Sequence, residues 1–238
     1  MTTSSPATPW IRAGLLALPV YGVIVSYATR TPQPDPVSDP AGWATFVSTP
    51  RYLAEHLASG VLGTVLVILG TVALGAYLSS TRSARMALGG MVAAVTGQIL
   101  FAVPATLSTF ATPAIGAAYL NGHQDVMAQQ FPAVLGPITA LAMLLAVVGN
   151  LILAVAIWKT GVLPRWTGAT FAAGTVTFYL LGAALGMSTT GASLPTQPIG
   201  GALLAIGAAG IAWTAIHVGH VDAKTHPSAT PQGTATPA

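Results

Sequence analysis

The sequence contains no cysteine, and only 5% of its 238 residues are charged. The absence of cysteine excludes disulfides, thiolate catalysis and metal or iron–sulfur sites with cysteine ligands. The scarcity of charge excludes an ordinary soluble domain, in which about 25% of residues are charged. Nucleic-acid binding needs clustered basic residues, and the eight Lys and Arg residues are scattered along the chain. A lipid bilayer is the partner that suits such a composition.

Apolar residues are abundant and make up 53% of the chain. A transmembrane helix needs about 20 predominantly apolar residues, each adding about 1.5 Å. Six stretches are long enough, so we predict an all-α membrane protein with a six-helix transmembrane domain in residues 1–220. The predicted spans are Trp10–Ala28, Leu57–Leu78, Met86–Leu107, Pro137–Trp158, Trp166–Met187 and Pro198–Gly219.

The remaining segments are interpreted from their composition. Residues 29–50, which are rich in proline and aspartate, are predicted to form an irregular external loop. Residues 108–131 could hold a short surface helix between Pro113 and Pro132. Residues 221–238 have little to bury and are predicted to form a disordered cytoplasmic tail.

The first span has a second interpretation. Ser26-Tyr27-Ala28 resembles a signal-peptidase site, so residues 1–28 could be a cleaved signal peptide. The hydrophobic stretch of about 19 residues is long for a signal peptide, in which the apolar region spans about 7–15 residues. We therefore favour a retained first helix.

The distribution of basic residues predicts the orientation in a plasma membrane. Cytoplasmic connections carry an excess of Lys and Arg, and this holds if both termini are cytoplasmic. The inner basic residues are then Arg12, Arg82, Arg85, Lys159, Arg165 and Lys224, which leaves Arg30 and Arg51 outside.

Four of the predicted helices carry a stripe of small residues interrupted by one larger polar side chain. In lipid, small residues let helix backbones approach each other closely. We therefore predict an antiparallel bundle whose four-helix core is formed by the second to fifth helices, with the first and sixth helices on its flanks. The polar members of the four stripes are His56, Gln98, Asn150 and Tyr179.

These polar side chains suggest three functions. Together with Glu55 they could line an outward-facing vestibule that binds or transports a small ligand. They could instead form interhelical hydrogen bonds in a structural or regulatory subunit, which would act in a homo-oligomer or beside a membrane partner. In that case the isolated chain would leave glycine stripes exposed to lipid. Glu55 and His56 could also act as the acid and base of a membrane enzyme.

Specific chemistry has little support in the sequence. The P-loop, GxSxG and HExxH motifs are absent, and we predict no catalytic residue, metal or cofactor. His123 and Asp125 could join Glu55 and His56 in a metal site, but their spacing matches no known ligand pattern. Arg51 precedes Glu55 by one helical turn in the less favourable order for an ion pair, so we expect no stabilising pair there.

The stretch GNLILAVAIWKTGVLPRWTG (Gly149–Gly168), with the sequence AYLSS after the second span, resembles an uncharacterised group of bacterial six-helix integral membrane proteins. The LPRW turn (Leu163–Trp166) is its most distinctive piece. The resemblance implies a six-helix topology and supplies no catalytic residues. In mechanical terms, Pro164 starts the fifth helix, Arg165 anchors it inside and Trp166 lies in the interface.

Overall fold

The structure is a computed structural model, and it describes residues 9–128, 133–189 and 193–225. Within these ranges the chain is helical and contains no strand. Five helices are long and apolar enough to cross a membrane. They are α1 (Pro9–Ala28), the continuous segment Pro50–Ser79, α5 (Ala84–Leu120), α6 (Leu135–Thr160) and the part Thr196–His217 of α9 (Thr196–Thr225). This composition of helices is consistent with an all-α membrane protein.

The second of these segments combines three elements. They are α3 (Pro50–His56), the π-helix η1 (Leu57–Leu62) and α4 (Gly63–Ser79). The fifth predicted span, Trp166–Met187, likewise falls on consecutive shorter elements. These are α7 (Arg165–Thr175), the π-helix η3 (Val176–Ala184) and α8 (Leu185–Thr189).

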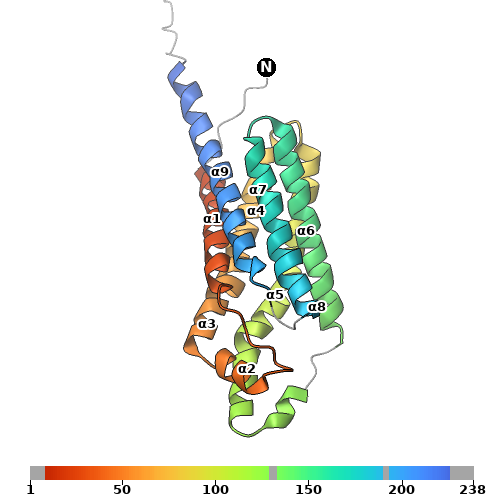
Figure 1. The fold of residues 1–238 in the computed structure, drawn as a ribbon. Coiled ribbons are helices and arrows are strands. Elements are labelled where there is room, and N and C mark those ends of the chain that lie inside the picture. The colour runs from red at the N-terminus through yellow and green to blue at the C-terminus, as the bar shows by residue number, and fades with distance from the viewer. Residues whose placement is uncertain (1–8, 129–132, 190–192, 226–238) are drawn as a thin grey trace, which may run out of the picture.

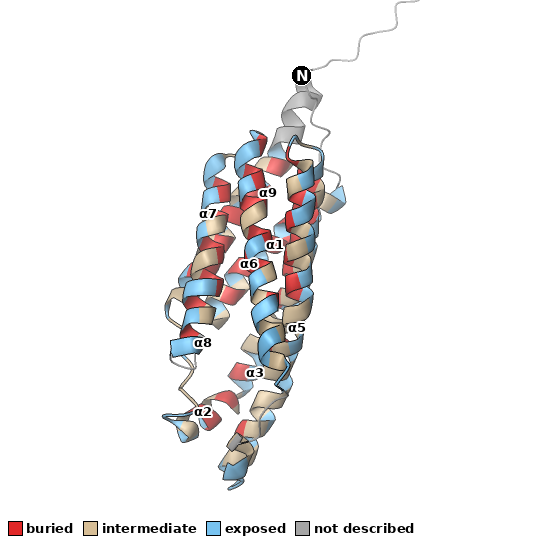
Figure 2. Cartoon of the chain, turned by 90° about the vertical axis from the view of Figure 1, so that its right-hand side faces the viewer, coloured by how far each residue is buried: buried red, intermediate tan, exposed pale blue. Residues whose placement is uncertain are grey.

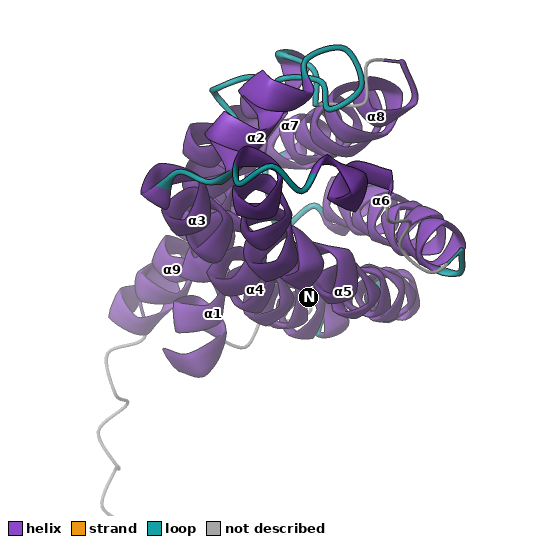
Figure 3. Cartoon of the chain, turned by 90° about the horizontal axis from the view of Figure 1, so that it is seen from below, coloured by secondary structure: helices purple, strands orange, loops and turns teal. Residues whose placement is uncertain are grey.

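The helices pack in a cyclic order. Along the chain, α4 packs on α5, α5 on α6 and α6 on α7. The cycle closes because α7 packs on α9, α9 on α1 and α1 on α4 (Figures 1 and 3). The expectation that the first and last spans flank a core of the second to fifth helices is therefore corrected: α1 and α9 pack extensively on each other and belong to the bundle.

The predicted small-residue stripes face the inside of the bundle. Buried residues line the inner sides of the helices, whereas the outer sides are exposed (Figure 2). The closest approach is between α5 and α6, where a Cβ on Gly97 would overlap the backbone of Ala146 and one on Gly149 would overlap that of Ala94. In a bilayer there is no hydrophobic driving force between helices, so they associate through close packing of this kind.

The two ends of the bundle differ. Following the predicted orientation, we call the end with α3 the outer end and the opposite end, with residues 80–83 and 161–164, the inner end. The outer end carries the short helix α2 (Pro40–Val47), which packs on α5, and the short 3₁₀-helix η2 (Gln124–Ala128). We call this assembly of α2, α3, η2 and the last turns of α5 the outer cap.

The outer cap has its own small core, formed by Trp43, Ala44, Val47 and Tyr52. The prediction of an irregular loop over residues 29–50 is therefore wrong for Pro40–Val47. Asp39 caps the helix by accepting a hydrogen bond from Gly42 N at 2.9 Å, and Pro40 occupies its first turn, where the missing N–H costs nothing.

Helix α5 is longer than predicted. It passes Pro104 and Pro113 and ends at Leu120, before Gly122 with φ +94°. Its 37 residues span about 55 Å, against a hydrocarbon thickness of about 30 Å, so its last turns extend out to the cap. Helix α9 also continues beyond the predicted boundary at residue 220, to Thr225, and residues 226–238 lie outside the described residues.

Candidate functional site

Two of the five predicted site residues meet in the middle of the bundle. Gln98 Nε2 on α5 donates a hydrogen bond to Tyr179 Oη on η3 at 2.7 Å, and the hydroxyls of Tyr179 and Tyr21 lie 3.1 Å apart. All three side chains are buried. The network connects three segments that are far apart in sequence, α1, α5 and η3.

Tyr21 was not among the predicted site residues. The signal that could have found it is a phenol in the middle of an apolar span, because a buried tyrosine hydroxyl usually needs a hydrogen-bond partner. The three groups are neutral and satisfy one another. Leu18, Val67 and Phe178 belong to the same buried core. The geometry is therefore that of an interhelical hydrogen-bond network.

Asn150 lies apart from this network. Its side chain is only 3% exposed, and its Oδ1 has no hydrogen-bond partner in the described part of the chain. An unpaired buried amide oxygen costs about 1–3 kcal/mol. Asn150 is thus the one predicted site residue that the fold buries with an unsatisfied oxygen.

His56 belongs to the outer cap. Its Nδ1 lies 3.0 Å from the carbonyl oxygen of Tyr52, and its ring stacks on the Tyr52 ring with centroids 3.8 Å apart. The Tyr52 hydroxyl in turn donates to the carbonyl oxygen of Ser108 on α5 at 3.2 Å. His56 is therefore held by its own helix, at the junction of α3 and η1.

Glu55 forms an ion pair with Arg51 despite the unfavourable order of the two residues in the helix. Its Oε1 lies 2.8 Å from Arg51 Nε, and Arg51 Nη2 donates to Thr31 Oγ1 at 2.9 Å. The expectation of no stabilising pair rested on the weak preference for residue order in a helix, and the geometry shows that the pair forms. That preference is outweighed here because Thr31, from the segment after α1, holds the other side of the guanidinium.

Glu55 and Arg51 also line a groove at the outer end, between α1 and α3. Its volume is about 600 Å³, and its third charged residue is Arg30. The guanidinium of Arg30 lies 3.4 Å from the centre of the Tyr27 ring and pairs with no carboxylate among the described residues. The remaining lining is apolar or small: Val23, Ile24, Tyr27, Ala28, Ala54 and Ala58. We call this hollow the outer groove.

The five predicted site residues thus separate into distinct places. Gln98 and Tyr179 share the central network, His56 is in the outer cap, Glu55 lines the outer groove and Asn150 is alone. His123 and Asp125 lie exposed beyond the end of α5. In residues 9–128, 133–189 and 193–225, no three or more His, Asp or Glu side chains come close enough to hold a metal ion.

Comparison with known proteins yields no relative for this chain: no family model, no curated protein and no solved structure matches it.

Proposed function

We propose that this chain is a six-span plasma-membrane protein, with both termini cytoplasmic, that binds a small amphipathic anion in the outer groove. One observation carries the proposal. The groove brings Arg30, a guanidinium without a carboxylate partner, to an apolar hollow large enough for a small molecule. Pockets for small ligands typically combine apolar walls with a few polar groups that fix orientation.

The six-span topology is supported by the continuity of the fifth segment. Elements α7, η3 and α8 follow one another without a break from Arg165 to Thr189. At about 1.5 Å per residue they are long enough for a bilayer of about 30 Å. The resemblance carried by Gly149–Gly168 favours the same number of helices.

The packing of α1 supports its retention in the mature protein. Gly22 on α1 contacts the backbone of Ala205 on α9 so closely that a Cβ would not fit. Removing residues 1–28 would also take Tyr21 away from the Tyr179 hydroxyl. A segment that supplies contacts to both α4 and α9 is an integral part of the bundle.

The ligand class follows from the charges and the walls of the outer groove. Arg51 is neutralised by Glu55, so the lining carries one net positive charge, at Arg30. The Tyr27 side chain is 56% exposed, and the groove is accessible beside it. A single anionic head with an apolar tail, such as a fatty acid, matches one free guanidinium above an apolar wall.

The other functions considered receive less support. A transport route through Gln98 and Tyr179 would cross a network whose groups are buried and bonded to each other. A subunit built around exposed glycine stripes is disfavoured because the stripe residues Gly70 and Gly168 face neighbouring helices of the same chain. An enzyme based on Glu55 and His56 is disfavoured because the two side chains bond to different partners, Arg51 and Tyr52.

Photolabelling of the protein in lipid nanodiscs tests the proposal. The probe is dodecanoate with a diazirine on its chain, and labelled peptides are identified by mass spectrometry. We expect labelling to concentrate on the segments 23–30 and 51–58. Arg30→Gln should reduce it about tenfold, because a hydrogen bond to a charged group contributes about 1.5–3 kcal/mol.

Two controls make the result specific. The alcohol with the same chain and diazirine should label these segments weakly, and Arg85→Gln, an exposed arginine at the inner end, should leave the labelling unchanged. Equal labelling by the acid and the alcohol, or equal labelling in the wild type and in Arg30→Gln, would refute binding of an anion in the outer groove.

A further inference from the structure

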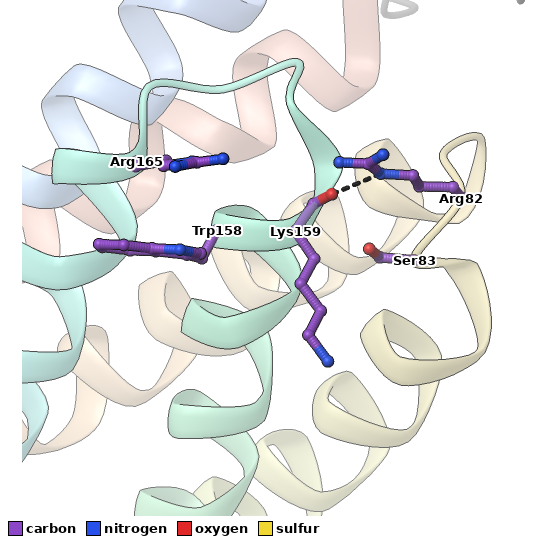
Figure 4. Close-up of a pocket in the computed structure, with 5 residues that line it drawn as sticks. All are labelled: Arg82, Ser83, Trp158, Lys159 and Arg165. Atoms are coloured by element: carbon purple, nitrogen blue, oxygen red, sulfur yellow. Dashed lines mark hydrogen bonds between the residues drawn. The ribbon is translucent and has the colours of Figure 1, made fainter.

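The inner end of the bundle contains a second hollow, of about 360 Å³, that the proposed function does not use. It is formed where the turn between α4 and α5 meets the turn between α6 and α7 (Figure 4). Its lining residues are Arg82, Ser83, Trp158, Lys159 and Arg165. We call this hollow the inner pocket.

Two side-chain contacts and a turn at Gly161 shape the inner pocket. Arg82 Nε donates a hydrogen bond to the carbonyl oxygen of Lys159 at 2.5 Å, which ties the two turns together. Gly161, with φ +70°, ends α6 and lets the chain turn toward Arg165. The Arg165 guanidinium lies over the Trp158 ring, 5.8 Å from its centre, as Figure 4 shows.

The three cationic side chains that line the hollow lie at two levels. In Figure 4 the guanidinium groups of Arg82 and Arg165 lie at the level of the turns, on either side of α6. The Lys159 side chain runs the other way, along the helix and away from the turns. This direction is usual, since helical side chains lean toward the N-terminus of their helix. Two guanidinium groups therefore border the pocket at the turns, and the Lys159 ammonium lies further along α6.

Among the side chains that the structure describes, no carboxylate neutralises these charges. The described ion pair, Arg51–Glu55, lies at the opposite end, and the lining of the inner pocket contains no carboxylate. Ser83 is only 7% exposed, and its hydroxyl has no hydrogen-bond partner within the described ranges. A hollow with three uncompensated cations and one free hydroxyl is suited to an anion that offers several acceptor oxygens. Phosphate is such a group, and arginine and lysine are its usual ligands in proteins.

We propose that the inner pocket binds the phosphate of an anionic phospholipid. The surface below the pocket favours a lipid over free phosphate. Trp158 is 47% exposed, and Val155 on α6 and Leu88 on α5 are exposed apolar residues within two turns of the lining residues. They offer a wall for acyl chains while the phosphate is held by the cations above. Basic pockets between transmembrane helices bind lipid head groups in this way.

Native mass spectrometry of the detergent-solubilised protein tests the proposal. Dioleoyl phosphatidylglycerol and dioleoyl phosphatidylcholine are titrated separately, and the bound fraction of each is measured. We expect phosphatidylglycerol to bind in preference. Lys159→Gln and Arg165→Gln should each weaken that binding about fivefold, because a basic residue near an anionic membrane surface contributes about 1 kcal/mol.

The matched control is Arg85→Gln, because Arg85 is exposed on the first turn of α5 but does not line the pocket. The thermal unfolding midpoint of each variant is measured first, to verify that the fold is retained. Lys159→Gln is the more informative variant, since its side chain makes no hydrogen bond in the described structure.

Three outcomes would overturn the proposal: equal binding of the two lipids, an equal loss in Arg85→Gln, or no loss in Lys159→Gln and Arg165→Gln. Competition by inorganic phosphate separates the two sources of the anion. Displacement of the lipid by millimolar phosphate would assign the pocket to a soluble phosphate and refute the lipid. The lipid site depends on the proposed topology but not on ligand binding in the outer groove. If dodecanoate failed to label the segment around Arg30, phosphatidylglycerol binding at Lys159 would be unaffected.

Discussion

The outer and inner ends of this bundle are built differently. At the outer end, α5 continues past the bundle and α2, α3 and η2 pack around it over a core that includes Trp43 and Tyr52. At the inner end, four-residue turns connect α4 to α5 and α6 to α7. The outer end therefore has its own packed core, whereas the inner end consists mainly of helix ends and short turns.

The two ends also differ in their charged residues. The outer end contains Asp35, Asp39, Glu55 and Asp125, and its Arg51 is paired with one of them. The inner cations Arg82, Lys159 and Arg165 have no carboxylate partner in the described part of the molecule. Under the proposed topology, the outer cation Arg51 is balanced within the protein, whereas the three inner cations face the cytoplasmic leaflet, whose anionic lipids we propose as their partners.

The largest expected effect compares two glycines on α5. Gly116 lies under the outer cap, where a Cβ would come within 2.5 Å of Val47 Cγ2 and 2.9 Å of the carbonyl oxygen of Ala44. Gly89, near the inner end of the same helix, has no atom within 4 Å of such a Cβ. Gly116→Ala should destabilise the protein by about 1–3 kcal/mol because overpacking must displace α2. Gly89→Ala should stabilise it by up to about 1 kcal/mol through helix propensity.

Reversible unfolding in SDS, followed by tryptophan fluorescence, measures both free energies. Each glycine is the control for the other, since the chemical change and the helix are the same. A destabilisation of equal size at the two positions would show that the cap contributes no packing of its own, and the contrast between the ends would be lost.

The sequence predicted the apolar helices well because hydrophobic length is a strong signal. It was less informative about the outer cap, although local signals were present. Asp39-Pro40 and Thr49-Pro50 both combine a capping side chain with proline in the first turn of a helix. The proline content of residues 29–50 was interpreted as a loop, whereas two of these prolines begin helices. Pro113 was likewise interpreted as a helix boundary, but α5 continues through it.

The candidate site was harder to predict, for a different reason. Helical periodicity identifies which side of a helix faces inward, and Gln98, Asn150 and Tyr179 are indeed buried. It does not specify which helices meet. Because α1 packs inside the bundle, Tyr21 reaches Tyr179, while Asn150 remains separate. The outer groove depends on the path of residues 29–31 after α1, and no pattern in the sequence predicts that path.

A smaller effect is expected in the middle of the bundle, away from both ends. Tyr179→Phe removes the hydrogen bonds to Gln98 and Tyr21. At about 0.6 kcal/mol for each interhelical bond, the protein should lose about 1 kcal/mol of stability. Asn150→Leu should instead be neutral or stabilising, because it removes an unpaired buried oxygen.

The same unfolding assay distinguishes these two variants by the sign of their effect. The loss in Tyr179→Phe should fall by about half when Gln98 has already been replaced by Leu, because only the contact with Tyr21 is then left to lose. Additive losses in the double variant would mean that the Gln98–Tyr179 bond does not stabilise the folded protein.

The smallest change in stability is expected for Glu55→Gln, which tests the charge contrast directly. The variant breaks the Arg51–Glu55 pair and leaves Arg51 held only by Thr31. Because Arg51 is largely exposed, the unfolding midpoint should hardly change, and any change should vanish at high salt.

The charge of the outer groove changes much more in Glu55→Gln, since Arg30 and Arg51 then face it without a carboxylate. Labelling by the dodecanoate probe should therefore increase, because the anion that we propose for the outer groove would meet two uncompensated cations instead of one. If labelling instead falls along with stability, the ion pair organises the groove, and the two ends differ in architecture rather than in the use of charge.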